Sequence, residues 1–218
     1  MAVLDVLTLS EAKTSLNIRD AVTQNDVELA GFITAASKRL DWLIGPVVRR
    51  QLISELHSGG GEHVFLKFYP VFSVQTVTEF KRDEAAGLVL AAETNLSRPD
   101  EAYQTHQYAT GGGLLADRIS RRSSAGTFSN RRARWAPGEE NVEVSYTAGR
   151  FDVTANVEPL YKQGAALILQ NMWRGQQDST GGLGEFDVPQ NNFPRWAVPR
   201  AVVQLFQDEI QQPKRLVA

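Results

Sequence analysis

The side chains best suited to acid–base or metal chemistry are the three histidines of this 218-residue chain. His57, His63 and His106 do not stand at metal-ligand spacing with one another or with paired carboxylates, and the H-E-x-x-H pattern is absent. His57 and His63 flank the glycine triplet 59–61, where surface histidines beside a turn are the simpler interpretation. The chain has no cysteine, which excludes disulfides, thiolate zinc sites and cysteine nucleophiles and fits a reducing compartment.

Two motifs resemble catalytic or phosphate-binding signatures, and neither is complete. Ser10, Glu11, Ala12 and Lys13 match S-x-x-K, the nucleophile signature of penicillin-binding proteins, but the companion S-D-N and K-T-G motifs are missing. The glycine triplets 59–61 and 111–113 are not followed by Lys-Ser/Thr and do not open a helix, so they are not phosphate loops. We therefore predict no enzyme activity, no catalytic residue, no bound metal and no cofactor.

One basic cluster is better suited to binding than to catalysis. Segment 118–135 reads RISRRSSAGTFSNRRARW, in which arginines surround a flexible Ser/Gly/Asn centre and Phe128 and Trp135 are interleaved. Arginine beside aromatic rings suits phosphate backbones or acidic protein surfaces, whereas a solvated loop is the competing interpretation. The formal net charge of −2 means that the whole chain is no blanket nucleic-acid binder. The candidate binding residues are Arg118, Arg121, Arg122, Arg131, Arg132 and Arg134.

Hydrophobic periodicity predicts helices at both ends of the chain. Thr8 with Glu11, and Asn25 with Glu28, stand at capping-box spacing and predict helices over 8–16 and 26–44. A nearly all-apolar helix over 158–174 should be the central packing element, with irregular loop after it up to 196, and a final helix starts near Pro199. The inward stripe of the second helix is expected to be Val27, Ala30, Ile33, Ser37, Leu40 and Ile44.

Between these helices the sequence alternates apolar and polar residues, which predicts strands with the glycine triplets at hairpin turns. The expected fold class is α+β: a small antiparallel helical bundle, made by the N-terminal helices and two C-terminal helices, with an inserted antiparallel β-rich section. The chain 1–218 is expected to be a single domain. Its helical base would be 1–46 and 157–212, the β-rich insertion 47–148, and the C-terminal tail 213–218.

Several stretches together carry a family resemblance. LTLSEAKTSL and DVELAGFITAASKRLDWLIG would be the first two helices, YPVFSVQTVTE the first sheet strands, VEVSYTAGRF with EPLYKQGAALILQNMW a strand–turn–helix, and VPRAVVQLF the closing helix. In this order they resemble the head–tail connector proteins of long-tailed bacteriophages, also called head-to-tail adaptor or head-completion proteins. The resemblance covers both ends and the frame of the chain. Segments 84–141 and 176–196 depart from it, because they are longer than in short family members.

The resemblance implies a structural virion protein at the head–tail interface, made in the cytoplasm of the bacterial host. It implies a homo-oligomeric ring, expected to be a dodecamer, that docks under the portal protein and binds downstream head–tail or tail-completion proteins. Genomic DNA would pass through the lumen without sequence specificity, and no membrane is involved. The residues themselves keep two rivals open: a nucleic-acid-binding module acting through 118–134, and an enzyme whose site the sequence does not reveal.

The last residues generate a testable docking prediction. Pro213 should end the final helix, and a tail that docks on the portal would follow; an undocked, disordered tail is the competing interpretation. Deleting the tail should leave the fold intact, because the apolar face of the last helix ends at Ile210, and should abolish portal attachment. Electron microscopy of particles checks this, and a normal yield of tailed particles would rule the docking role out. The tail residues are Lys214, Arg215, Leu216, Val217 and Ala218.

Overall fold

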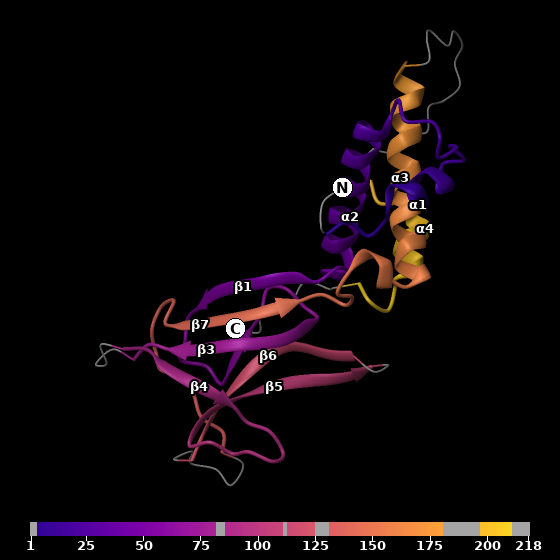
Figure 1. The fold of residues 1–218 in the computed structure, drawn as a ribbon. Helices are drawn as coiled ribbons and strands as arrows, with labels where there is room; N and C mark the ends of the chain where they lie inside the picture. The colour runs from indigo at the N-terminus through magenta and orange to yellow at the C-terminus, as the bar shows by residue number, and fades with distance from the viewer. Residues whose placement is uncertain (1–3, 82–85, 111–112, 125–130, 181–196, 211–218) are drawn as a thin grey trace. The chain divides into compact units, whose positions relative to one another are not determined.

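The computed structural model describes residues 4–81, 86–110, 113–124, 131–180 and 197–210 (Figure 1). The chain divides into two compact units. Residues 1–48 and 151–218 belong to a helical unit, and Arg49–Arg150 form a β unit. Among the described residues, no helix is long and apolar enough to cross a membrane.

The first two helices form where the sequence patterns place them. In α1 (Leu9–Ser15) the Thr8 hydroxyl accepts the Glu11 N–H and the Glu11 carboxylate accepts the Thr8 N–H, which is the predicted capping box. The second helix, α2 (Asp26–Ile44), has no side-chain cap at Asn25, so the second predicted box is wrong. The predicted inward position of Val27 is also wrong, because this side chain is 90% exposed. The buried residues of α2 are Leu29, Ile33, Ala36, Ser37, Leu40 and Ile44.

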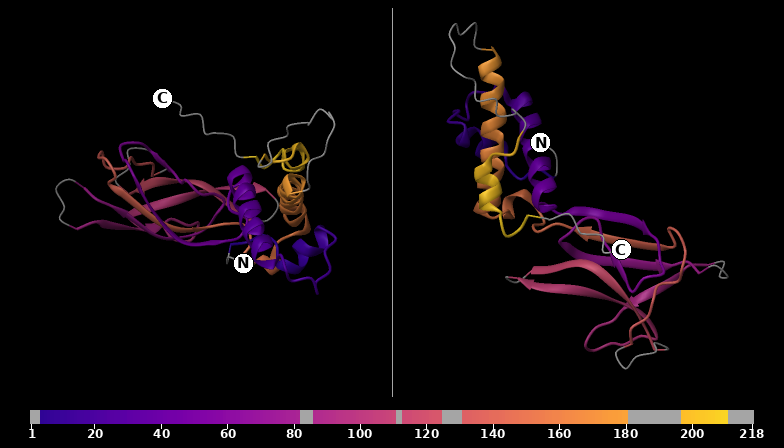
Figure 2. Two further views of the ribbon diagram at one scale, coloured as in Figure 1. Left: turned by 90° about the horizontal axis from the view of Figure 1, so that it is seen from above. Right: turned by 180° about the vertical axis from the view of Figure 1, so that it is seen from behind.

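The longest helix, α3 (Pro159–Thr180), contacts α1, α2 and α4 (Arg200–Leu205) and is flanked by α2 and α4 in Figure 2. Its buried face includes Tyr161, Ala165, Ile168 and Met172, which are the residues of the predicted apolar stripe. The helix continues to Thr180, so the predicted loop is wrong over 174–180, while 181–196 lie outside the described residues. The final helix, α4, is shorter than expected, because it ends at Leu205 and does not continue to Pro213.

The β unit is one seven-stranded sheet with the order β1-β7-β3-β4-β5-β6-β2. Its strands are β1 (Arg50–His57), β2 (His63–Phe65), β3 (Val71–Glu79), β4 (Leu88–Ala92), β5 (Glu101–Thr110), β6 (Gly113–Ser123) and β7 (Val142–Ala148). All neighbours are antiparallel except β4 and β5, which run parallel. An additional pairing of Val71 on β3 with Ala116 on β6 joins two strands that are not neighbours in this order. The sheet is therefore nearly closed and barrel-like.

This architecture shows that the predicted fold class is wrong. The described fold is mostly β, with a nearly closed barrel-like sheet and few helices, two of which have only 7 and 6 residues. It is not a small helical bundle with an inserted antiparallel section. Periodicity identified strand positions, but a local pattern does not say which strands pair. For the same reason the expected hairpin at 59–61 does not form, because β1 pairs with β7 and β2 pairs with β6.

The sheet encloses an apolar core of its own. The alternation of β7 buries Val142, Val144 and Tyr146 completely, and Val77 of β3 and Ile119 of β6 belong to the same cluster. A second cluster lies among the helices and is centred on α2 and α3. Each unit thus buries apolar surface within itself.

Two helical glycines give a matched stability test. Gly31 of α2 is exposed, and no atom lies within 4 Å of the position that an added Cβ would take, so Gly31→Ala should stabilise the protein by about 1 kcal/mol through helix propensity. At Gly164 of α3 an added Cβ would lie 2.4 Å from the Phe206 ring, which is buried and stacked on Tyr161. Gly164→Ala should destabilise the protein, because overpacking costs about 1–3 kcal/mol. Urea unfolding measures both, and a Gly164→Ala variant as stable as Gly31→Ala would contradict this packing.

Candidate functional site

The candidate arginines occupy two adjacent segments. Arg118, Arg121 and Arg122 lie on strand β6, and the other three follow on 131–134, while 125–130 lie outside the described residues. The second segment runs back along β6: the Ser123 N–H donates to the Arg131 carbonyl, the Ala133 N–H donates to the Arg121 carbonyl, and Arg122 forms a β-bridge with Arg132. The structure therefore brings the three arginines of β6 and the three arginines of 131–134 together on adjacent, hydrogen-bonded segments.

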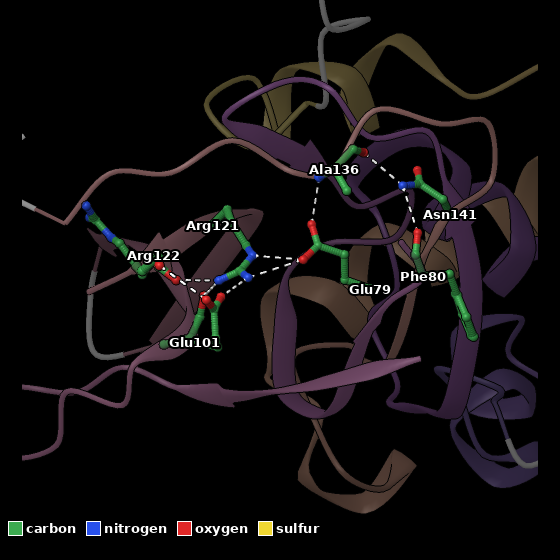
Figure 3. Close-up of polar contacts among 9 residues, drawn as sticks. Glu79, Phe80, Glu101, Arg121, Arg122, Ala136 and Asn141 are labelled. Atoms are coloured by element: carbon green, nitrogen blue, oxygen red, sulfur yellow. Dashed lines mark hydrogen bonds and ion pairs between the residues drawn. The ribbon is translucent and has the colours of Figure 1, made fainter. Parts of the chain in front are cut away.

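Arg121 is a buried residue whose positive charge is paired with the carboxylates of Glu79 and Glu101. Its side chain is 4% exposed, and its Nε and Nη2 each lie 3.2 Å from Oε2 of Glu79, which is 1% exposed (Figure 3). The guanidinium group also donates to the Glu101 carboxylate and to the carbonyl oxygens of Ala102 and Arg122. Arg121 thus connects β3, β5 and β6 from inside the β unit.

The other oxygen of Glu79 holds the segment that follows the arginines. Oε1 accepts the Ala136 N–H at 2.7 Å, and the Ala136 carbonyl accepts Nδ2 of Asn141 at 2.8 Å (Figure 3). Asn141 also accepts the Gly59 N–H at 2.8 Å. An added Cβ at Gly59 would lie 1.9 Å from the Ala136 oxygen, so the close approach requires glycine here. These hydrogen bonds of Glu79 and Asn141 hold the segment 131–141 against the sheet.

The remaining arginines differ in environment. Arg131 donates to the Glu93 carboxylate at 3.3 Å and to the Pro99 carbonyl, and Arg122 donates to the Gln104 side chain. Arg132 and Arg134 are exposed. The structure therefore divides the predicted cluster by burial into one interior arginine, Arg121, partly exposed arginines and exposed arginines.

A small recess opens where β2, β6 and the 131–134 segment meet. Its volume is about 50 Å³, and its lining is Glu62, His63, Ser120, Arg121, Arg122, Arg132 and Ala133. Nδ1 of His63 lies 2.6 Å from Oγ of Ser120, its partner in the β2–β6 register. Burial lowers the pKa of His63, and the cations of Arg118, Arg132 and Arg122 lower it further against the opposing effect of Glu62. The surroundings of His63 therefore disfavour its charged form.

The sequence did not predict this recess, although the alternation of side chains along β6 indicates part of it. Alternation along β6 puts Arg118, Ser120 and Arg122 on one face and Ile119 with Arg121 on the other. Because Ile119 is a core residue, Arg121 is expected inside and Arg118 and Arg122 are expected on the opposite face, where they are partly exposed, whereas Ser120 on that face is buried as well. What no local pattern provides is the pairing of β2 with β6, which brings His63 beside Ser120.

A second polar cluster lies elsewhere in the β unit. The Tyr146 hydroxyl donates to Glu55 at 2.5 Å and accepts the Phe68 N–H, and Glu55 also accepts the Lys67 N–H. Burial alone would raise the pKa of Glu55, but hydrogen bonds from His57, Tyr146 and the Lys67 backbone hold it below its usual value. Burial and the Glu55 contact raise the pKa of the Tyr146 phenol. This cluster joins β1, β7 and the segment before β3.

Among the described residues, no group of three or more histidine, aspartate or glutamate side chains could hold a metal ion. His57 contacts Glu55 and His63 contacts Ser120, so these two histidines have protein partners, while the side chain of His106 lies outside the described part of the structure. The tail, Lys214 to Ala218, lies outside the described residues, and its docking role stays a prediction.

No protein-family model and no curated protein matches the sequence. Solved structures do share the fold. A chain in the neck of an empty gene transfer agent particle, computed with C6 symmetry, has a TM-score of 0.60 at 14% identity, over 98% of this chain and 94% of that chain. A chain in the virion of a native gene transfer agent particle has a TM-score of 0.57 at 14% identity, over 95% and 91%.

A further chain, in the neck of a native gene transfer agent particle computed with C12 symmetry, has a TM-score of 0.52 at 13% identity, over 98% and 97%. At these identities the likeness establishes the fold. The chain has the fold of proteins in the neck of a gene transfer agent, a phage-like head–tail neck. The resemblance to head–tail connectors seen in the sequence is therefore confirmed at the level of fold.

The buried ion pair generates a stability prediction. Arg121→Met leaves the Glu79 carboxylate inside the β unit without its cation, and such losses cost about 3–5 kcal/mol. Arg98→Met, at an exposed position of the same unit, should change the free energy of unfolding by less than about 0.5 kcal/mol. Urea unfolding of the two variants checks this, and equal effects would show that the pair is not structural.

Proposed function

We propose that this protein is a structural subunit of the neck of a phage-like particle, where it forms a ring between the portal and the tail. The observation that carries the proposal is the fold shared with neck chains over 98% of this chain. The likeness spans both units, so it does not depend on a widespread β-barrel alone. DNA would pass through the lumen of the ring without sequence-specific contacts.

The sheet supports an assembly role because it ends in two edge strands, β1 and β2. Unpaired strand edges are templates for pairing with another chain, and Leu56 of β1 and Phe65 of β2 are 55% and 48% exposed. In a ring, one surface of each copy contacts a different surface of the next copy, and the contact repeats until the ring closes. A dodecamer suits necks computed with C12 or C6 symmetry, because both operations occur in a twelvefold ring.

Portal protein and tail-completion proteins are the proposed partners above and below the ring. The C-terminal tail is proposed to contact the portal, and both units together would act as the single connector domain. The nucleic-acid-binding alternative has a weaker basis, because Arg121 is already matched by two carboxylates and Arg131 by Glu93. Direct DNA binding would depend chiefly on exposed Arg132 and Arg134.

The ring proposal predicts an observable assembly. Mixing the protein with its cognate portal should give a complex with added ring density on one face of the portal in electron micrographs. Mass measurement of the complex should give a copy number equal to the portal symmetry or a simple fraction of it. A portal preparation of unchanged mass, together with particles that lack the protein, would overturn the proposal.

A further inference from the structure

The exposed face of α2 carries a tryptophan beside two cations. Trp42 is 76% exposed, whereas Trp135 and Trp173 are buried in the cores of the two units. Lys38 and Arg39 are exposed as well, and they stand four and three positions before Trp42. Side chains at these spacings lie beside one another on a helix. The three residues form a surface that combines a large exposed ring with positive charge, which we call the Trp42 surface.

Packing inside the helical unit does not explain this surface. The side of α2 that faces the core includes Leu40, which is fully buried. Trp42 stands two positions later, and at 3.6 residues per turn this spacing puts the two side chains on opposite sides of the helix. Tryptophan and arginine are enriched among the side chains that contribute most to binding at protein interfaces. The Trp42 surface therefore has the composition of a binding surface.

The β unit presents a turn of complementary chemistry. Residues 137–140 read Pro-Gly-Glu-Glu and are all exposed, and we call them the acidic turn. The Gly59 N–H donates to the Gly138 carbonyl at 3.0 Å, and the Ser58 hydroxyl accepts the Glu140 N–H at 3.3 Å. Two carboxylates and a proline ring thus stand on a turn whose backbone is anchored to the segment after β1.

We propose that the acidic turn of one copy docks on the Trp42 surface of a second copy of this chain. The two carboxylates of the turn match the two cations in charge, and proline segments bind well on exposed aromatic rings. The two surfaces are different and one chain carries both, as a contact that repeats around a ring requires. The ring rests on the proposed function, whereas the pairing of the two surfaces can be measured between free copies.

The chemistry of the Trp42 surface favours this turn over duplex DNA. Phosphates would match Lys38 and Arg39 in charge, but the bases of a duplex are stacked on one another and do not cover an exposed ring. The acidic turn supplies both kinds of contact, because Pro137 offers an apolar ring next to the carboxylates of 139 and 140.

The first experiment uses disulfide crosslinking, which is specific here because the chain has no cysteine. Full-length Arg39→Cys and Glu139→Cys proteins, one of them tagged, are mixed at high concentration under mild oxidation. The control mixture pairs Arg39→Cys with Leu96→Cys, since Leu96 is a fully exposed loop residue of the β unit. The first mixture should form heterodimers at least about tenfold faster, because a disulfide needs Cα atoms within about 7 Å.

Salt gives the crosslinking test a second readout. The rate advantage should fall when the salt concentration is raised from about 0.05 M to about 0.5 M, because exposed charges are then screened. Equal rates in the two mixtures would overturn the contact. This experiment needs neither a portal nor a closed ring, so it decides the pairing even where the proposed ring does not form.

The second experiment reverses the charges and follows assembly on the cognate portal. The first variant combines Lys38→Glu with Arg39→Glu. The second variant combines Glu139→Lys with Glu140→Lys. Each variant alone should form rings at least about tenfold less well than the wild type, because like charges then meet at every contact. Mixing the two variants should restore assembly, since each protein then offers the other an opposite charge.

The matched control combines Arg19→Glu with Arg98→Glu, which reverses two exposed cations outside both surfaces. It should assemble within about twofold of the wild type, as expected for distant sites. Urea unfolding checks that the variants are equally stable.

Three results of the second experiment would overturn the proposal. Normal assembly by both variants would show that neither surface contacts a neighbour. Loss of assembly in the first variant alone would mean that a different partner covers the Trp42 surface. A mixture that stays inactive, while a chain with all four substitutions assembles, would mean that the two surfaces meet within one chain. Failure of the wild-type protein to assemble would instead contradict the proposed ring, and the crosslinking would still decide the contact.

Discussion

The buried contact between Glu79 and Arg121 constrains the rest of the β unit. An ionised side chain inside a protein is tolerated only when its charge and hydrogen-bonding groups are matched, because desolvation is costly. The five N–H donors of one guanidinium allow Arg121 to reach β3, β5 and its own strand together. Glu79 uses its second oxygen for the Ala136 N–H, so the same carboxylate positions the chain beyond the sheet.

Closure of the sheet shows why polar contacts decide its geometry. Apolar burial stabilises a curled sheet and, through the alternation of side chains, excludes one-residue slips of its strands. It is non-directional, so it does not distinguish registers that differ by two residues. Register shifts in β3 opposite β7 change the course of the strands, and the pairing of Val71 with Ala116 joins β3 to β6. The Tyr146 hydroxyl then connects Glu55 to the Phe68 backbone. These directional contacts select one arrangement among the many that would bury the same core.

The buried ion pair and the surface recess share one residue, Arg121. Arg121 pairs with Glu79 and also lines the recess together with Arg122 and Arg132. A segment whose backbone is held by hydrogen bonds loses less conformational freedom when a partner binds to it, which lowers the entropic cost of binding. The fold shared with neck proteins is consistent with a scaffold of this kind.

The sequence by itself determined the local elements of this protein. Capping at Thr8 and the helix over 26–44 follow from interactions within a few residues, as does the alternation of β7. Only the tertiary structure decided that β4 and β5 run parallel and that the sheet, not a helical bundle, dominates the fold. It also decided that Arg121 lies inside, because its partner Glu79 stands 42 positions away in the sequence. Periodicity reports which face of an element is apolar, whereas strand pairing and charge matching depend on residues that only folding brings together.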